Sequence, residues 1–152
     1  MPTLAVNKKA RFDYEISETF EAGLVLFGHE VKSMKEGHIS LKGSYLVTQK
    51  GKKDLPDFIL RKTHVTAYKK ADITDYDPER DRKILHNKKE INYLIGKYKE
   101  EGYSLIPIKI YTKKNIIKLE FGLGKGKKKH DKREDIKKRD VERRIRTLTK
   151  YQ

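Results

Sequence analysis

Alternating apolar and polar residues predict that most of this chain is built from short β-strands. The apolar side chains of Phe12, Tyr14 and Ile16 alternate with acidic ones, as in a strand with one buried face. Residues 24–27 are apolar at every position, which is typical of a strand inside a closed core. Further strands are predicted at 45–47, 58–60 and 64–68, and in a final hairpin at 105–111 and 116–121 that turns at 113–115. We expect Pro107 to lie where the hairpin needs no backbone donor.

Two helices are expected among these strands. Residues 28–37 carry two apolar residues one turn apart before Gly37, which predicts a short helix. A longer helix is predicted over 88–101, with Asn87 as its N-cap. Its apolar residues follow helical spacing: Ile91, Leu94, Ile95 and Tyr98. The polar segment 69–82 is predicted to be a loop.

Short strands with one long helix late in the chain favour a mainly β fold with helices. We expect a small β-barrel of the OB-fold type, capped by the helix 88–101 and formed by residues 1–121. A β-sandwich is the alternative, because periodicity alone does not decide whether a sheet closes.

The pattern changes in the basic segment 122–152. This segment holds 13 Lys and Arg against 5 Asp and Glu, with too few apolar residues to form its own core. Three glycines at alternate positions are expected to form a flexible hinge: Gly122, Gly124 and Gly126. Acidic residues precede basic ones by four positions at several places, an order that favours a helix. A narrow apolar stripe accompanies them: Val141, Ile145 and Leu148. We expect a flexible tail that is disordered when free and becomes helical on a partner.

The net charge of +15 and the pI of about 9.8 indicate a polyanionic partner, nucleic acid rather than a membrane. The chain has no cysteine, which excludes disulfides and thiolate metal sites. None of its five histidines shows metal-ligand or catalytic spacing, so we expect no metal, no cofactor and no catalytic residue. A signal-peptide pattern is missing at the start, and a cytoplasmic protein, monomeric when free, is expected.

Basic residues with interleaved aromatic rings point to RNA in particular. They cluster at 8–14 and again at 80–86. Cations neutralise phosphates, while rings and guanidinium groups stack on unpaired bases. The alternative interpretation is that Phe12 and Tyr14 belong to the core, and for Tyr14 we favour it.

Five motifs closely resemble one known family, the small protein B or SsrA-binding proteins of bacteria. They lie in one register at 7–11, 18–23, 28–33, 77–85 and 126–140. The resemblance implies an OB-fold that binds the tRNA-like domain of transfer-messenger RNA and delivers it to stalled ribosomes. It also implies that the tail occupies the empty messenger channel and the small-subunit decoding centre.

Site residues are carried over from this resemblance by position. The implied RNA contacts are Asn7, Lys8, Arg11, Glu21, Glu30, Leu85 and Lys118. The implied decoding-centre residues are Gly126, Lys127, Lys128, His130, Asp131, Lys132 and Arg133, with His130 as the stacking group. Two positions depart from the family: Phe12 replaces a common His, and Val141 replaces a common Trp. A family member of this kind would be no enzyme, since peptide transfer is ribosomal chemistry.

Two other functions are compatible with parts of this pattern. A structural RNA-binding protein of the ribosome would share the composition, and preference for the tRNA-like domain separates it from an adaptor. An RNA-modifying or RNA-cleaving enzyme would have to use Glu21 or His130, and no constellation of residues supports it.

Overall fold

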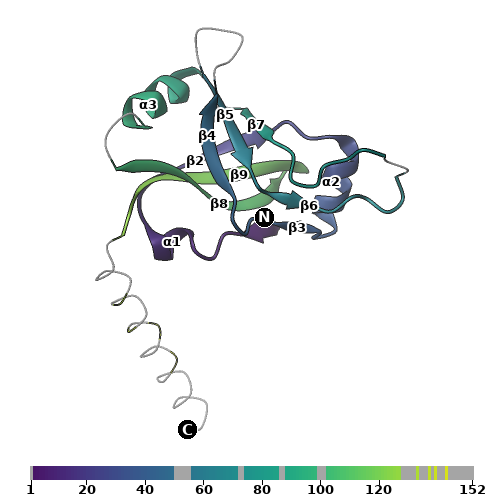
Figure 1. Ribbon diagram of the computed structural model, residues 1–152, viewed down its shortest axis with the longest axis horizontal. Helices are drawn as coiled ribbons and strands as arrows, with labels where there is room; N and C mark the ends of the chain where they lie inside the picture. Colours follow the sequence, from purple (N-terminus) through teal and green to yellow (C-terminus); the bar gives the residue numbers. More distant parts are fainter. Residues whose placement is uncertain are drawn as a thin grey trace.

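The computed structural model describes residues 2–49, 56–71, 74–85, 88–98 and 102–127, together with Arg133, Lys137, Arg139 and Arg143. In order, its helices and strands are β1 (Thr3–Val6), α1 (Ala10–Asp13), β2 (Tyr14–Leu24), α2 (Gly28–Lys35), β3 (Ile39–Ser40), β4 (Tyr45–Gln49), β5 (Asp57–Arg61), β6 (His64–Val65), β7 (Arg82–Leu85), α3 (Lys88–Tyr98), β8 (Tyr103–Lys113) and β9 (Ile116–Gly126). The helices lie between strands, and five strands follow one another from β3 to β7 (Figure 1).

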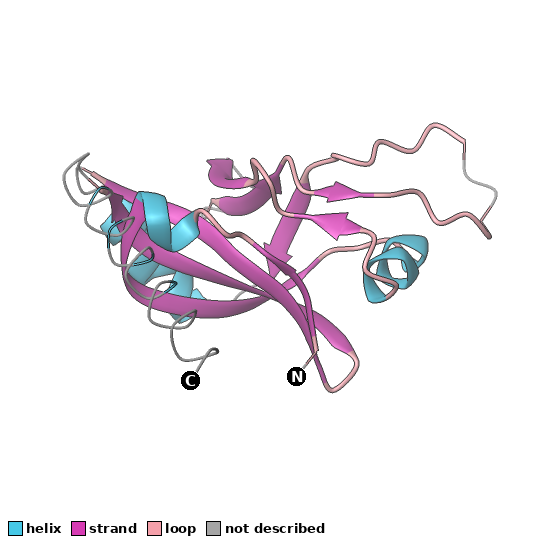
Figure 2. Ribbon diagram, turned by 90° about the horizontal axis from the view of Figure 1, so that it is seen from below, coloured by secondary structure: helices cyan, strands magenta, loops and turns pink. Residues whose placement is uncertain are grey.

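Seven strands form one antiparallel sheet in the order β1-β8-β9-β2-β7-β5-β4, and β3 pairs with β6 separately. The long strands β2, β8 and β9 make the strongly curved centre of this sheet (Figure 2). The prediction of a mainly β fold with helices is confirmed. The structure differs from the predicted barrel in one respect. Although β4 lies close to β8 across the core, the hydrogen-bonded sheet keeps β1 and β4 as edges among the described residues.

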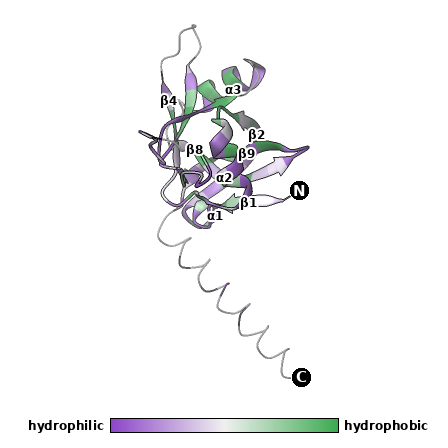
Figure 3. Cartoon of the chain, turned by 90° about the vertical axis from the view of Figure 1, so that its right-hand side faces the viewer, coloured by the Kyte–Doolittle hydropathy of each residue, from purple (hydrophilic) through white to green (hydrophobic). Residues whose placement is uncertain are grey.

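Apolar side chains from the curved sheet and from α3 form the main core. Leu60, Ile110 and Leu119 are fully buried there, and Leu94 of α3 joins the same cluster. The apolar colouring of α3 and the central strands follows this arrangement (Figure 3). The predicted helix 88–101 is confirmed as far as Tyr98, and its last residues lie outside the described part of the chain.

The β8–β9 hairpin follows from its sequence. Lys114 and Asn115 form a two-residue turn and both have positive φ, 52° and 65°, as a type I′ turn requires. Pro107 pairs with Phe121, and the register shifts between Pro107 and Lys109, so Pro107 lies directly beside a bulge, a place where proline occurs in strands.

Other elements differ from the prediction at their ends. Phe12 lies in the short helix α1, so the strand predicted from this position begins at Tyr14. The strand β2 ends at Leu24, although an apolar strand was predicted over 24–27. The strand β7 was not predicted, because one of its two inward side chains is the charged Arg82.

The predicted glycine hinge is wrong at two of its three positions. Gly122 and Gly124 lie inside β9, where both are buried. A Cβ atom on Gly122 would lie 2.7 Å from the Ile16 side chain, and one on Gly124 would lie 2.5 Å from the carbonyl oxygen of Glu15. These glycines allow close strand packing, and the body extends past the predicted boundary at residue 121 to the end of β9. Most of the predicted tail lies outside the described residues.

Candidate nucleic-acid interface

Three of the predicted RNA contacts lie together on the outer face of the sheet. Gly23 pairs with Leu85 on one side and with Lys118 on the other. Residues that pair across neighbouring strands lie on the same face of a sheet. Glu21 is two residues before Gly23 in the same strand, so it lies on this face as well. We call this surface the outer sheet face; it consists of Leu85, Glu21, Lys118 and Tyr111, on the four adjacent strands β7, β2, β9 and β8.

Glu21 is held in a defined orientation on the outer sheet face. Its carboxylate accepts a hydrogen bond from the Tyr111 hydroxyl, and the Nζ atom of Lys113 lies 3.4 Å away. The hydrogen bond from the Tyr111 hydroxyl lowers the pKa of Glu21 below its usual range, and Lys113 and Lys118 lower it further. Burial and the Glu21 charge raise the pKa of Tyr111, which keeps the hydroxyl as a donor. The result is an exposed, charged carboxylate that can accept hydrogen bonds from base amino groups or 2′-hydroxyls.

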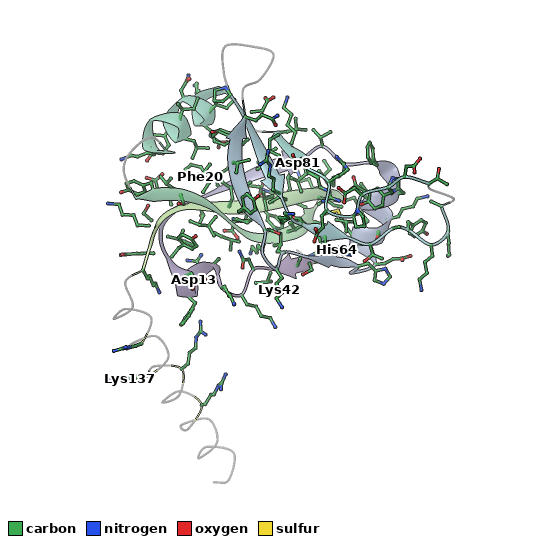
Figure 4. The ribbon with its side chains drawn as sticks, in the orientation of Figure 1. Asp13, Phe20, Lys42, His64, Asp81 and Lys137 are labelled. Atoms are coloured by element: carbon green, nitrogen blue, oxygen red, sulfur yellow. The ribbon has the colours of Figure 1, made fainter. Side chains whose placement is uncertain are left out.

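A second group of predicted contacts lies beside a groove next to α1. Its volume is about 510 Å³, and we call it the α1 groove. Its polar and aromatic lining includes Asn7, Lys8, Lys9, Asp13, Tyr14, Lys42 and Tyr45. Three lysines against one aspartate make this lining basic, and Figure 4 shows Asp13 and Lys42 on the same side of the body.

Asn7 connects the α1 groove to the hairpin strand β8. Its backbone N–H donates to the Ile108 carbonyl at 2.7 Å, and its Nδ2 atom donates to the Pro107 carbonyl at 2.8 Å. Lys8 and Arg11 are exposed close to it along the chain. Asn7 therefore positions the segment that presents these two cations, which suits phosphate binding.

Glu30 does not belong to either surface. Its side chain is fully buried, so the predicted direct RNA contact is contradicted by the structure. Its carboxylate accepts hydrogen bonds from Arg80, from Arg82 at 2.6 and 3.0 Å, and from the Tyr76 hydroxyl at 2.8 Å. The backbone N–H of Phe27 adds a further bond at 2.9 Å. Glu30 thus connects α2 to the first residue of β7 and to the segment before that strand.

The charge of this buried network is well compensated. Burial alone would raise the pKa of Glu30, but hydrogen bonds from Arg80, Phe27 N–H and Arg82 lower it to about 2. Burial and the neighbouring Glu30 charge raise the pKa of Tyr76 to about 12. One buried carboxylate faces two guanidinium groups, so Glu30 stays ionised and Tyr76 stays a donor.

The predicted decoding-centre residues fall only partly within the described chain. Gly126 ends β9, and the Lys127 N–H donates to the Asp13 carbonyl at 2.8 Å, beside the α1 groove. Arg133 is exposed and helical in its backbone. The remaining members, Lys128, His130, Asp131 and Lys132, lie outside the described residues. Further along, the Arg139 guanidinium lies 5.0 Å from the centre of the Phe12 ring.

Several residues at these surfaces were not predicted from the sequence. Tyr111 and Lys113 orient Glu21 from about 90 residues away, and no local pattern connects them. Lys42 and Tyr45 reach the α1 groove through the β3–β4 connection and β4. Their basic and aromatic character was the only available signal.

Across the described ranges, no group of three or more His, Asp or Glu side chains is arranged to hold a metal ion. No helix in the same ranges is long and apolar enough to cross a membrane.

Comparisons with known proteins agree on one family. Residues 4–151 match the family model described as SmpB protein. The chain is 47% identical over 142 residues to an SsrA-binding protein of Geobacillus thermodenitrificans (strain NG80-2) and to one of Bacillus subtilis (strain 168), covering 93% of this chain and 88% of each relative. A solved chain described as "tmRNA-SmpB: a journey to the center of the bacterial ribosome" superposes with a TM-score of 0.64 at 36% identity, covering 90% of this chain and 95% of that one. The chain therefore belongs to the SmpB protein family.

Proposed function

We propose that this protein is an RNA-binding adaptor of trans-translation. It binds the tRNA-like domain of transfer-messenger RNA, completes its tRNA shape and delivers it to stalled ribosomes in the cytoplasm. The family membership and the naming of relatives as SsrA-binding proteins support this function. Peptide transfer belongs to the ribosome, so the protein itself acts without catalysis.

The outer sheet face is the observation that carries the proposal. It combines a cation, Lys118, an oriented carboxylate, Glu21, and the exposed apolar side chain of Leu85. A cation attracts phosphates, a carboxylate accepts from amino and 2′-hydroxyl groups, and an apolar side chain packs against a base or ribose. This mixture suits folded RNA with exposed bases better than a regular duplex, which mainly offers phosphates.

The basic tail is proposed to work on the ribosome rather than on the transfer-messenger RNA. The chain leaves β9 beside the α1 groove, because Lys127 bonds to Asp13 there. We infer that the α1 groove and the residues after 127 face the small subunit, with the tail in the messenger channel and the decoding centre. The body and the tail then contact different parts of one complex, as an adaptor requires.

RNA preference tests this function. The affinity for an isolated tRNA-like domain is measured beside an elongator tRNA and an unrelated duplex, all at physiological salt. We expect clear preference for the tRNA-like domain. The affinity for this domain should be reduced by Lys118→Ala and by Leu85→Ala. Equal affinities for the three RNAs would favour the alternative of a structural RNA-binding protein that relies on its positive charge.

A further inference from the structure

The outer sheet face continues beyond β2 into a row of exposed apolar side chains. Val25 and Phe27 follow Gly23 on the outer sheet face. They alternate with Leu24, which is buried, and with Leu26, which packs partly against the core. Val25 is 44% exposed and Phe27 is 52% exposed. The Val25 N–H donates to the Lys83 carbonyl at 2.9 Å, so the pairing with the β7 strand continues past the end of β2. The backbone that carries this row leads from β2 to the start of α2 (Figure 1).

Phe27 is exposed and at the same time held in place. The Arg80 guanidinium carbon lies 4.0 Å from the centre of its ring, and the His29 ring is stacked at 5.5 Å with an interplanar angle of 29°. Arg80 is fixed by the buried carboxylate of Glu30 and donates to the Val25 carbonyl at 3.2 Å. An aromatic ring supported by a guanidinium group is a preformed surface for stacking.

We propose that Phe27 is a stacking platform for an unpaired base of the bound RNA, flanked by Val25 and Leu85. From Glu21 to Phe27, six residues at about 3.3 Å each span about 20 Å, long enough for several nucleotides. This inference rests on the proposed RNA-binding function and adds a second contact region to the outer sheet face.

The size and charge of the patch favour RNA over a protein partner. Three apolar side chains, those of Val25, Phe27 and Leu85, are far too few for a stable protein interface, which takes about 20 residues on each side. They do match the face of one or two bases. Lys118 lies on the same face, paired with Gly23, and the whole chain carries +15, so the phosphates beside such bases meet a positive surface.

A tryptophan at position 27 tests the stacking directly. The chain contains no tryptophan, so Phe27→Trp creates a single reporter. We expect this variant to keep its affinity for the tRNA-like domain and to lose much of its fluorescence on binding. The matched control is Tyr93→Trp, because Tyr93 is 41% exposed on α3, at the opposite end of the body from α2 (Figure 1). A Phe27→Trp variant that binds tightly with unchanged fluorescence would overturn the proposal.

Removing the Phe27 ring tests how much the stacking contributes to RNA binding. Phe27→Ala should weaken binding of the tRNA-like domain roughly 5- to 150-fold, the range found when an aromatic platform is removed. Tyr93→Ala should leave the affinity unchanged. The variant is expected to fold, because the backbone N–H of Phe27 still reaches Glu30, and a melting curve confirms this.

The outcomes separate this inference from the proposed function. If the wild-type protein showed no preference for the tRNA-like domain, the proposed function itself would be contradicted. A wild-type preference combined with an unchanged affinity of Phe27→Ala for the tRNA-like domain would refute only the platform. An equal loss in Tyr93→Ala would also refute it, and so would a Phe27→Ala defect confined to ribosome association, which would place the ring against the ribosome instead.

Discussion

The buried network around Glu30 gives the sharpest prediction for stability. The substitution Glu30→Gln keeps the shape of the side chain and removes its charge. It leaves Arg82, which is fully buried, and Arg80, which is largely buried, without their anionic partner. Removing one partner of a buried ion pair typically costs about 3–5 kcal/mol.

The pKa of Glu30 supports a similar magnitude. It falls from an ordinary value of 4.5 to about 2 in the folded protein. At about 1.4 kcal/mol per pKa unit, this shift corresponds to roughly 3 kcal/mol of stability. Because the folded pKa is lowered, this stability is fully present above pH 4.5 and is lost as the pH falls from 4.5 towards 2.

Urea unfolding at several pH values measures both effects. At pH 7 we expect Glu30→Gln to lower the unfolding free energy by about 3 kcal/mol, and the difference from wild type should shrink below pH 4.5. Glu36→Gln is the control, because Glu36 is half-exposed near the same helix and lies 3.9 Å from His38. It should change stability by less than about 1 kcal/mol. A loss below 1 kcal/mol in Glu30→Gln, or one independent of pH, would refute the reasoning.

Three further predictions concern the glycines, the cations and the tail. Gly124→Ala should destabilise the protein by about 1–3 kcal/mol, because its Cβ would meet the Glu15 backbone. By contrast, the position of a Cβ atom at Gly96 in α3 is open, so Gly96→Ala should stabilise the protein by about 0.5–1 kcal/mol. Thermal melting of the two variants measures both effects. Lys118→Ala should reduce the salt slope of RNA binding by about 0.7–0.9, and an unchanged slope would remove Lys118 from the phosphate contacts. A chain ending at Lys127 keeps all of β9, so it should bind the tRNA-like domain yet fail in rescue, whereas a chain ending at Phe121 should not fold stably; circular dichroism and RNA binding distinguish them.

Local sequence signals predicted the elements that local physics determines. The α3 helix and the β8–β9 hairpin were found because the helical spacing and the turn with positive φ each lie within a few residues. The strand β7 was missed because Arg82 points into the core, where its charge is acceptable only beside Glu30. The glycines of β9 were misinterpreted, since a flexible hinge and close strand packing both select glycine.

The site was predictable in its residue types and not in its arrangement. The seven predicted RNA contacts came from the family resemblance, and strand pairing brings three of them onto one face. The burial of Glu30 could not be seen locally, because its partners lie about 50 residues later in the chain. For the same reason, the hydrogen bond from Tyr111 to Glu21 appears only once β8 and β2 are placed beside β9.

The most direct measurement is nascent-chain tagging in a reconstituted translation system. Ribosomes stalled on a truncated message are supplied with charged transfer-messenger RNA, with and without this protein, and the tagged product is quantified. The account predicts tagging only when the full chain is present, and none when the chain ends at Lys127. Equal tagging with and without the protein would contradict the adaptor function.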